Sequence, residues 1–187
     1  MDPNIDWHYI SSDAKEDHYP IRLLKNGNLC GSVSYEGKKY MTTNTCAIDA
    51  FIQLLTSANI DSPAYKNYMA LTSPSLTNIG ESLTRKHILN AYKQRINILN
   101  KLFKANILPN NVYHIAAESN IYVLINKIIA IGMFEHTTEE SVVCSKESFI
   151  YTLRGVIAYE GNEQNDPNIL GHYIAYCLRR NNVWEIL

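Results

Sequence analysis

Residues 46–60 read Cys-Ala-Ile-Asp-Ala-Phe-Ile-Gln-Leu-Leu-Thr-Ser-Ala-Asn-Ile, without a glycine or a proline. Apolar side chains recur at helical spacing and on nearly every face, at positions 48, 51, 52, 54 and 55. Thr43, Asn44 and Thr45 precede this run, and they are residue types that favour the N-cap of a helix. The sequence therefore predicts a central, buried helix with Cys46 in its first turn or at its cap.

On the N-terminal side of this helix, the sequence is typical of short strands joined by turns. Asn26-Gly27 is a strong signal for a tight hairpin, and Glu36-Gly37 predicts a second turn. We therefore expect a small meander of strands over residues 22–41. Residues 1–20 are polar and of mixed charge, and we expect them to be a loosely ordered lead-in.

On the C-terminal side, the chain first predicts loop and then helices. Residues 60–82 contain two prolines and several serines and threonines, so we expect a loop with at most short helices. Residues 83–106 predict one long amphipathic helix, which Pro109 would end. A third helix is expected over residues 118–131, stopped by Gly132.

The last part of the chain is rich in isoleucine, valine and tyrosine, which favour strands. It predicts strands over residues 149–159, 173–178 and 183–187. Helices first and an antiparallel sheet second predict an α+β fold. We expect a single domain over residues 1–187, in which a mainly helical lobe (40–135) packs on a sheet lobe (149–187).

Composition limits the class of protein and its partners. The 187 residues are 46% apolar and 19% charged, which is typical of a globular chain, and the formal net charge is −1. We therefore expect no nucleic acid and no membrane surface as a partner, since both need a strong positive field. The N-terminus lacks the basic and apolar regions of a signal peptide, so we expect the cytosol or the nucleus.

The four cysteines, at positions 30, 46, 144 and 177, form no CxxC pair. Their spacing does not favour a zinc site, and we expect no metal and no cofactor. Cys46 is placed at a helix start, where the pKa of a thiol falls and its thiolate becomes a nucleophile. The simpler alternative is that Cys46 is a small buried core residue.

A nucleophilic thiol needs a histidine as its base, and the chain has six. His172 differs from the others because it follows Gly171 and begins an apolar strand after a polar loop. A histidine at the start of a strand has a fixed backbone and a partly exposed ring, which suits a general base. A histidine at a loop edge without any role is the alternative.

Two longer segments are similar to the motifs of a known family. Residues 44–55, Asn-Thr-Cys-Ala-Ile-Asp-Ala-Phe-Ile-Gln-Leu-Leu, resemble the cysteine box of ubiquitin-specific proteases. Residues 151–161, followed by Gly171-His172-Tyr173, an aromatic-rich strand and Trp184, resemble the histidine box of the same family. The two boxes stand in the family's order and cover roughly residues 40–57 and 149–187.

This resemblance implies a papain-like fold and a single catalytic domain. The helix bearing Cys46 would belong to the helical thumb, and the sheet bearing His172 to the palm. Cys46 would be the nucleophile and His172 the base of a deubiquitinase, a cysteine isopeptidase that cuts after the C-terminal glycine of ubiquitin or a ubiquitin-like protein. The absence of CxxC pairs implies a minimal member without the family's zinc-binding fingers.

The sequence also departs from the family's pattern around the cysteine. Met41 stands five residues before Cys46, where the family has an asparagine that donates to the oxyanion. Asn44, Thr42 or Tyr40 could replace that donor, and we name Asn44 as the candidate. Asp49 stands where most members have asparagine, and it is similar to the SUMO-specific isopeptidase branch.

The family's third catalytic residue follows the tryptophan by a few positions. Here that position would lie beyond Leu187, since Trp184 is followed by only three residues. We therefore expect that the chain is a fragment of a longer protein, works with a Cys–His pair, or is inactive. Two alternatives to an active isopeptidase stay open: a pseudoenzyme that binds a modifier or another protein, and a thiol enzyme with another acyl substrate.

Overall fold

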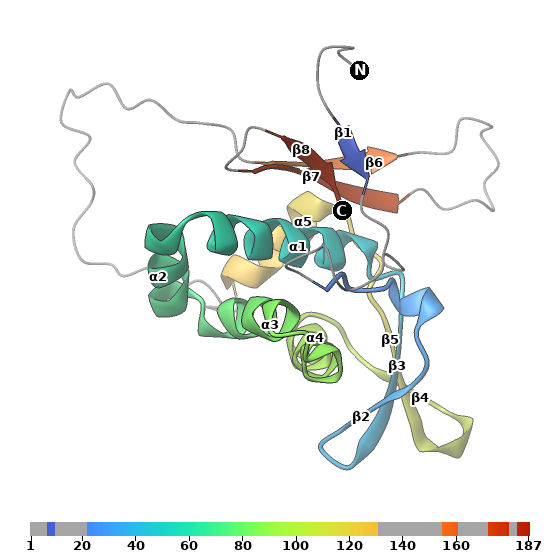
Figure 1. Ribbon diagram of the computed structural model, residues 1–187. Helices are drawn as coiled ribbons and strands as arrows, with labels where there is room; N and C mark the ends of the chain where they lie inside the picture. The colour runs from blue at the N-terminus through green and yellow to red at the C-terminus, as the bar shows by residue number, and fades with distance from the viewer. Residues whose placement is uncertain (1–6, 10–21, 131–154, 161–171, 180–182) are drawn as a thin grey trace.

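The computed structural model describes residues 7–9, 22–130, 155–160, 172–179 and 183–187. Within these ranges it has five α-helices and two four-stranded sheets, which confirms the predicted α+β class. Helix α1 (Cys46–Asp61) lies between one sheet and the pair of helices α3 (Pro74–Thr84) and α4 (Ile88–Leu102) (Figure 1). None of the described helices is long and apolar enough to cross a membrane.

Helix α1 confirms the prediction of a central buried helix. Cys46 is its first residue, and Ile48, Phe51 and Ile52 are buried in the main core. Thr45 is the N-cap, but its side chain makes no capping bond. Its hydroxyl instead donates to Asp49 and accepts a hydrogen bond from the backbone N–H of Gly27. The start of α1 is therefore tied to a segment that lies well before it in the sequence.

The prediction of a loop over residues 60–82 is wrong, because two helices fill this region. Helix α2 (Pro63–Thr72) and α3 each begin with proline at the first helical position. Proline is favoured there, because its missing N–H has no partner in the first turn and its φ already fits a helix. The two prolines therefore start helices in this chain, with Ser62 and Ser73 as their N-caps.

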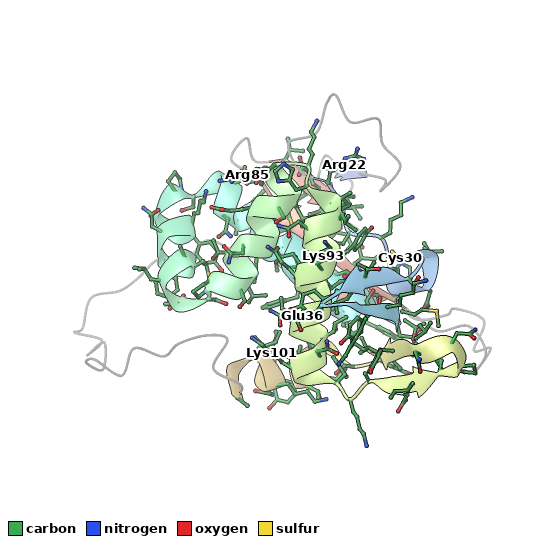
Figure 2. The ribbon with its side chains drawn as sticks, turned by 90° about the horizontal axis from the view of Figure 1, so that it is seen from below. Arg22, Cys30, Glu36, Arg85, Lys93 and Lys101 are labelled. Carbon is green, nitrogen blue, oxygen red and sulfur yellow. The ribbon has the colours of Figure 1, made fainter. Side chains whose placement is uncertain are left out.

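The long helix predicted over residues 83–106 is confirmed over Ile88–Leu102, which form α4, but its predicted bounds are wrong. The chain leaves α3 after Thr84, and Lys86 adopts a positive φ of 60° before α4 begins. Helix α5 (Ile121–Ala130) confirms most of the third predicted helix; residue 131 lies outside the described residues. Figure 2 shows α4 from below, with Lys93 and Lys101 on it.

One sheet is built around the start of α1 and has the order β2-β3-β5-β4. Its strands are β2 (Val33–Tyr35), β3 (Lys38–Thr43), β4 (Asn106–Leu108) and β5 (Val112–Ala116). The predicted turn at Glu36-Gly37 is confirmed, with positive φ at both residues. Strands β4 and β5 were not expected in a mainly helical lobe.

The hairpin predicted at Asn26-Gly27 is wrong. Asn26 is instead the N-cap of a short 3-10 helix, η1 (Gly27–Leu29). Gly27 is needed for close packing, since a Cβ atom there would lie 2.5 Å from the carbonyl oxygen of Thr42. The glycine therefore lets the backbone approach β3 instead of forming a tight turn.

The other sheet has the order β1-β8-β7-β6. Strands β6 (Gly155–Glu160), β7 (His172–Leu178) and β8 (Trp184–Ile186) are antiparallel neighbours and confirm the predicted sheet, though residues 149–154 lie outside the described part. Strand β1 (Trp7–Tyr9) pairs in parallel with β8, so these three residues correct the expected loose lead-in. Ala175 and Cys177 of β7 pack on Ala50 of α1 in a small buried cluster.

Candidate functional site

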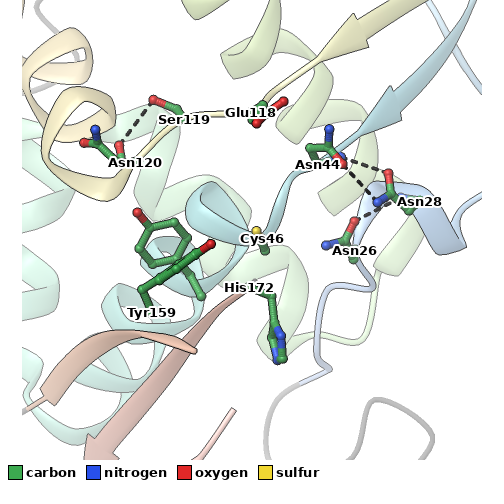
Figure 3. Close-up of a pocket in the computed structure, with 10 residues that line it drawn as sticks. Asn26, Asn28, Asn44, Cys46, Glu118, Ser119, Asn120, Tyr159 and His172 are labelled. Atoms are coloured by element: carbon green, nitrogen blue, oxygen red, sulfur yellow. Dashed lines mark hydrogen bonds between the residues drawn. The ribbon is translucent and has the colours of Figure 1, made fainter. Parts of the chain in front are cut away.

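Cys46 and His172 line one cavity of about 710 Å³ between the start of α1 and the start of β7 (Figure 3). Cys46 is the first residue of α1 and is half-buried, whereas His172 is the first residue of β7 and is exposed. The helix and the sheet therefore bring together the two residues that the sequence singles out. A smaller cavity of about 220 Å³ also includes both residues.

The two side chains are not hydrogen-bonded to each other, and both belong to the described residues. Figure 3 shows the imidazole of His172 pointing away from the sulfur of Cys46. The backbone N–H of Cys46 lies in the first turn of α1, where a helix leaves its N–H groups without an internal partner. Cys46 thus combines a thiol and a backbone donor without a partner in the helix, in a residue that lines the cavity.

Three asparagines form the wall of the cavity beside Cys46. Asn28 and Asn44 bind each other twice. Asn28 Nδ2 donates to Asn44 Oδ1 at 3.1 Å, and the Asn44 backbone N–H donates to Asn28 Oδ1 at 2.9 Å. Asn26 Oδ1 accepts from the Asn28 backbone N–H at 3.0 Å. Asn44 adopts a positive φ of 55°, a conformation that asparagine tolerates better than most residues.

The opposite wall combines the segment before α5 with two tyrosines. Glu118, Ser119 and Asn120 line the cavity from that segment. Tyr159 and Tyr173 line it from β6 and β7, with ring centroids 5.2 Å apart. The Tyr173 hydroxyl accepts a hydrogen bond from the Ile121 N–H at 3.2 Å, which ties β7 to the start of α5. Amide groups and aromatic rings therefore surround the cavity, with Glu118 as an acid in its wall.

Behind Cys46, Asp49 and Arg95 form an ion pair inside the protein. Arg95 Nη1 lies 2.9 Å from Asp49 Oδ1, and the side chains are 2% and 8% exposed. Burial raises the pKa of the Asp49 carboxyl, and the charge of Arg95 and the hydroxyl of Thr45 oppose this shift. Arg95 Nη1 also donates to the Lys25 carbonyl at 2.9 Å. Asp49 therefore makes its contacts within the core, and its similarity to the SUMO-specific branch stays a prediction.

The residues considered as oxyanion donors do not all lie at the cavity. Tyr40 is buried in the core, and Thr42 is buried with its hydroxyl accepting from Arg95 Nη2 at 3.3 Å. Met41 pairs with His114 across the β3–β5 ladder. Asn44 alone of the three candidates lines the cavity. A third catalytic residue beyond Leu187 stays a prediction.

Sequence reasoning missed Asn26, Asn28, Tyr159 and the 118–120 segment as lining residues. Tyr173 and Tyr159 fall within the histidine-box segments, so the motif carried a signal for them. The asparagines carried none, because Asn26-Gly27 is equally typical of a simple turn. Their place at the cavity depends on contacts with residues 42–49, which sequence spacing does not reveal.

No family model, no curated protein and no solved structure matches this chain. Among the described residues, no group of three or more His, Cys, Asp or Glu side chains gathers as a metal site would require.

Proposed function

We propose that this chain is a cysteine isopeptidase with a papain-like arrangement. It would hydrolyse the bond after the C-terminal glycine of ubiquitin or a ubiquitin-like modifier. Cys46 would be the nucleophile and His172 the general base and acid. The observation that carries the proposal is that Cys46, at a helix N-terminus, and His172, at a strand start, line one cavity. The resemblance of residues 44–55 and 151–173 to the two protease motifs supplies the substrate class.

The thiol chemistry follows from this arrangement. Cys46 is the first residue of α1, so its sulfur lies at the end of the helix where the dipole and the unpaired backbone N–H groups stabilise negative charge that develops in a reaction. The thiolate attacks the carbonyl carbon of the terminal glycine, and His172 holds the proton that the thiol lost. His172 then gives this proton to the leaving lysine amine, and a thioester to Cys46 remains. Water hydrolyses the thioester, with His172 accepting its proton.

This cycle requires the imidazole to turn toward Cys46. The ring of His172 is exposed and therefore able to change its rotamer, and catalytic hydrogen bonds are often formed only when substrate is bound. The cavity also suits an extended glycine-rich tail, since its amide side chains can bind a peptide backbone and its tyrosines can pack on it.

A second candidate function is a weak or inactive pseudoenzyme that binds a modifier without cutting it. The orientation of His172, which points away from Cys46, favours this alternative. Both functions use the same cavity, and they differ in whether Cys46 forms a covalent bond with the modifier.

The test is labelling with ubiquitin, SUMO and other modifiers that carry a C-terminal propargyl group, read by intact-protein mass. We expect one modifier to form a 1:1 adduct with wild type and none with Cys46→Ala. Cys177→Ala is the matched control, because Cys177 is buried and its loss should leave the adduct unchanged. Binding of the unmodified modifiers is measured in parallel by calorimetry.

Each result points to one conclusion. An adduct that persists in Cys46→Ala would contradict the assignment of the nucleophile. Binding without an adduct would overturn the isopeptidase and support the pseudoenzyme. Neither binding nor an adduct with any modifier would contradict both functions.

A further inference from the structure

We infer that Asn26 donates the side-chain hydrogen bond to the oxyanion of this reaction, in the place that the sequence assigns to Asn44. The inference rests on the proposed function, because an oxyanion forms only if Cys46 attacks a carbonyl. Asn26 lines both cavities that contain Cys46 and His172. No sequence pattern points to it, since it lies in the segment that resembles a simple turn.

The orientation of the Asn26 amide follows from its hydrogen bond. A backbone N–H can only donate, so the Asn26 atom that faces the N–H of Asn28 must be its oxygen. The NH₂ group is then turned to the other side. Figure 3 shows this nitrogen on the side of Cys46 and His172. Asn26 thus presents a donor, and not an acceptor, to the cavity.

The amide of Asn44 is used differently. Asn28 Nδ2 can only donate, so it fixes Asn44 Oδ1 toward Asn28. In Figure 3 the amide nitrogen of Asn44 points away from Cys46. Asn44 and Asn28 thus form a brace that holds the segment before α1 against η1, and this brace also orients Asn26 through the Asn28 N–H.

The segment that carries Asn26 is fixed relative to the nucleophile. The Gly27 N–H donates to Thr45 Oγ1 at 2.7 Å, and Thr45 directly precedes Cys46. On the other side of Asn26, the Lys25 carbonyl accepts from Arg95 Nη1 at 2.9 Å. Both neighbours of Asn26 are therefore held by contacts that also hold the start of α1. A donor fixed in advance stabilises developing charge without reorganising, which is how oxyanion sites lower a barrier.

Asn26 takes no atom from the substrate in this role. When the Cys46 sulfur bonds to the carbonyl carbon, the π electrons of the C=O bond move to the oxygen. This oxyanion accepts hydrogen bonds from the Cys46 backbone N–H and from Asn26 Nδ2. When the C=O bond re-forms, the C–N bond breaks, and the lysine amine leaves with the proton that His172 supplies.

The test separates steps that form an oxyanion from a step that does not. Hydrolysis of a modifier with a C-terminal coumarin amide passes through an oxyanion, whereas addition of the thiolate to a propargyl group gives a vinyl thioether and forms none. In Asn26→Ala we expect kcat for hydrolysis to fall by about hundredfold to thousandfold, with KM and the rate of propargyl labelling little changed. Asn26→Asp should lose as much, because its carboxylate can still accept from Asn28 but cannot donate.

Asn67→Ala is the matched control, because Asn67 is an exposed residue of α2 that lines neither cavity, and we expect it to keep kcat. Asn44→Ala is measured beside it, and we expect it to lose less of kcat than Asn26→Ala, because it affects Asn26 only through the brace with Asn28. Melting curves check that each variant folds, and the isosteric Asn26→Asp replaces Asn26→Ala if the latter does not. If both Asn26 variants hydrolyse as wild type does, or if only Asn44→Ala loses turnover, the role of Asn26 is overturned and the isopeptidase stands. Wild type that labels without hydrolysing has a reactive Cys46 but no hydrolase activity, and this result overturns both the oxyanion role and the isopeptidase. Wild type that neither labels nor hydrolyses overturns the proposed function itself.

Discussion

Helix α1 carries an aspartate–arginine pair near each of its ends, and the two pairs hold different parts of the molecule. Near the N-terminus, Arg95 Nη1 lies 2.9 Å from Asp49 Oδ1, and the two side chains are 2% and 8% exposed. At the C-terminus, Arg179 grips Asp61 with both Nε (2.7 Å) and Nη2 (2.9 Å), and these side chains are 10% and 13% exposed. The first pair is thus more completely removed from water than the second.

The other hydrogen-bond partners of each arginine show which segments its ion pair connects. Arg95 comes from α4 and reaches the Lys25 carbonyl and the Thr42 hydroxyl, so it organises the segments that carry Asn26 and lead into Cys46. Arg179 follows β7 and also binds Glu185 of β8, with Nη1 and Oε2 2.6 Å apart. The first pair therefore positions the nucleophile side of the cavity, and the second joins α1 to the sheet that bears His172.

The largest effect should come from breaking the buried pair. Arg95→Met leaves the Asp49 carboxylate in the core without its cation, and removing one partner of a buried ion pair typically costs about 3–5 kcal/mol. We expect a loss of this size in the free energy of unfolding, measured by urea denaturation. Any hydrolase activity should fall as well, because the Lys25 carbonyl, which also accepts from Cys30 Sγ, loses its hydrogen bond from Arg95.

The double variant Asp49→Leu/Arg95→Met sharpens this result, since replacing both charges with apolar groups is often neutral. We expect it to regain much of the lost stability but not the activity, because the contact to the Asn26 segment stays broken. A loss below about 1 kcal/mol in Arg95→Met would show that this pair is no more important than one on the surface.

Breaking the second pair should lower the free energy of unfolding by less than breaking the first. Arg179→Met removes charged hydrogen bonds to Asp61 and Glu185, each of which can still reach water at 13% and 14% exposure. Hydrogen bonds to charged groups contribute about 1.5–3 kcal/mol, so we expect a loss near the lower end of this range. The same urea titration measures it, and Asp61→Asn is the control for the α1 side of the contact. A larger loss than in Arg95→Met would reverse the comparison.

The parts of the fold that depend on local sequence pattern are predictable, and those that depend on contacts with the rest of the molecule are not. Helix α1 and strands β6 to β8 have a strong local pattern, and their existence and order were predicted correctly. The helices after Pro63 and Pro74 were missed because proline ends one segment or starts the next, and only the neighbouring serines and the core behind them decide which. The break at Lys86 depends on a single residue with a positive φ inside a continuous amphipathic pattern.

The candidate site divides in the same way. Cys46 and His172 lie at the start of elements with clear boundaries, so the sequence places them well. The environment of Asn26 instead depends on contacts between residues far apart in the chain, such as Gly27 with Thr45 and Lys25 with Arg95. Local propensity gives Asn26-Gly27 a hairpin, and these distant contacts override it. The buried contact of Asp49 with Arg95 is another that sequence spacing does not reveal, because the two residues are 46 positions apart.

The smallest expected effect on stability concerns Cys177. This residue lies beside the C-terminal half of α1, whereas Cys46 is the first residue of the helix. Burial raises the pKa of the Cys177 thiol from 9.0 to about 11. The folded protein therefore keeps this proton at a pH where the unfolded chain has lost it. The contribution of the neutral Cys177 thiol to the free energy of unfolding is complete below about pH 9 and declines as the pH rises toward about 11.

The variant Cys177→Ala lacks the Cys177 thiol but keeps every other titrating group. The difference in stability between wild type and this variant therefore reports the titration of Cys177. We expect the stability advantage of wild type over Cys177→Ala in urea to shrink by about 1 kcal/mol between about pH 8 and about pH 10. Iodoacetamide should correspondingly alkylate Cys177 only when the protein unfolds. An unchanged difference in stability at the two pH values would mean that the thiol is not held in its neutral form. Cys177 packs between α1 and the sheet that Arg179 joins to α1. Such a result would therefore mean that water reaches this contact between α1 and the sheet.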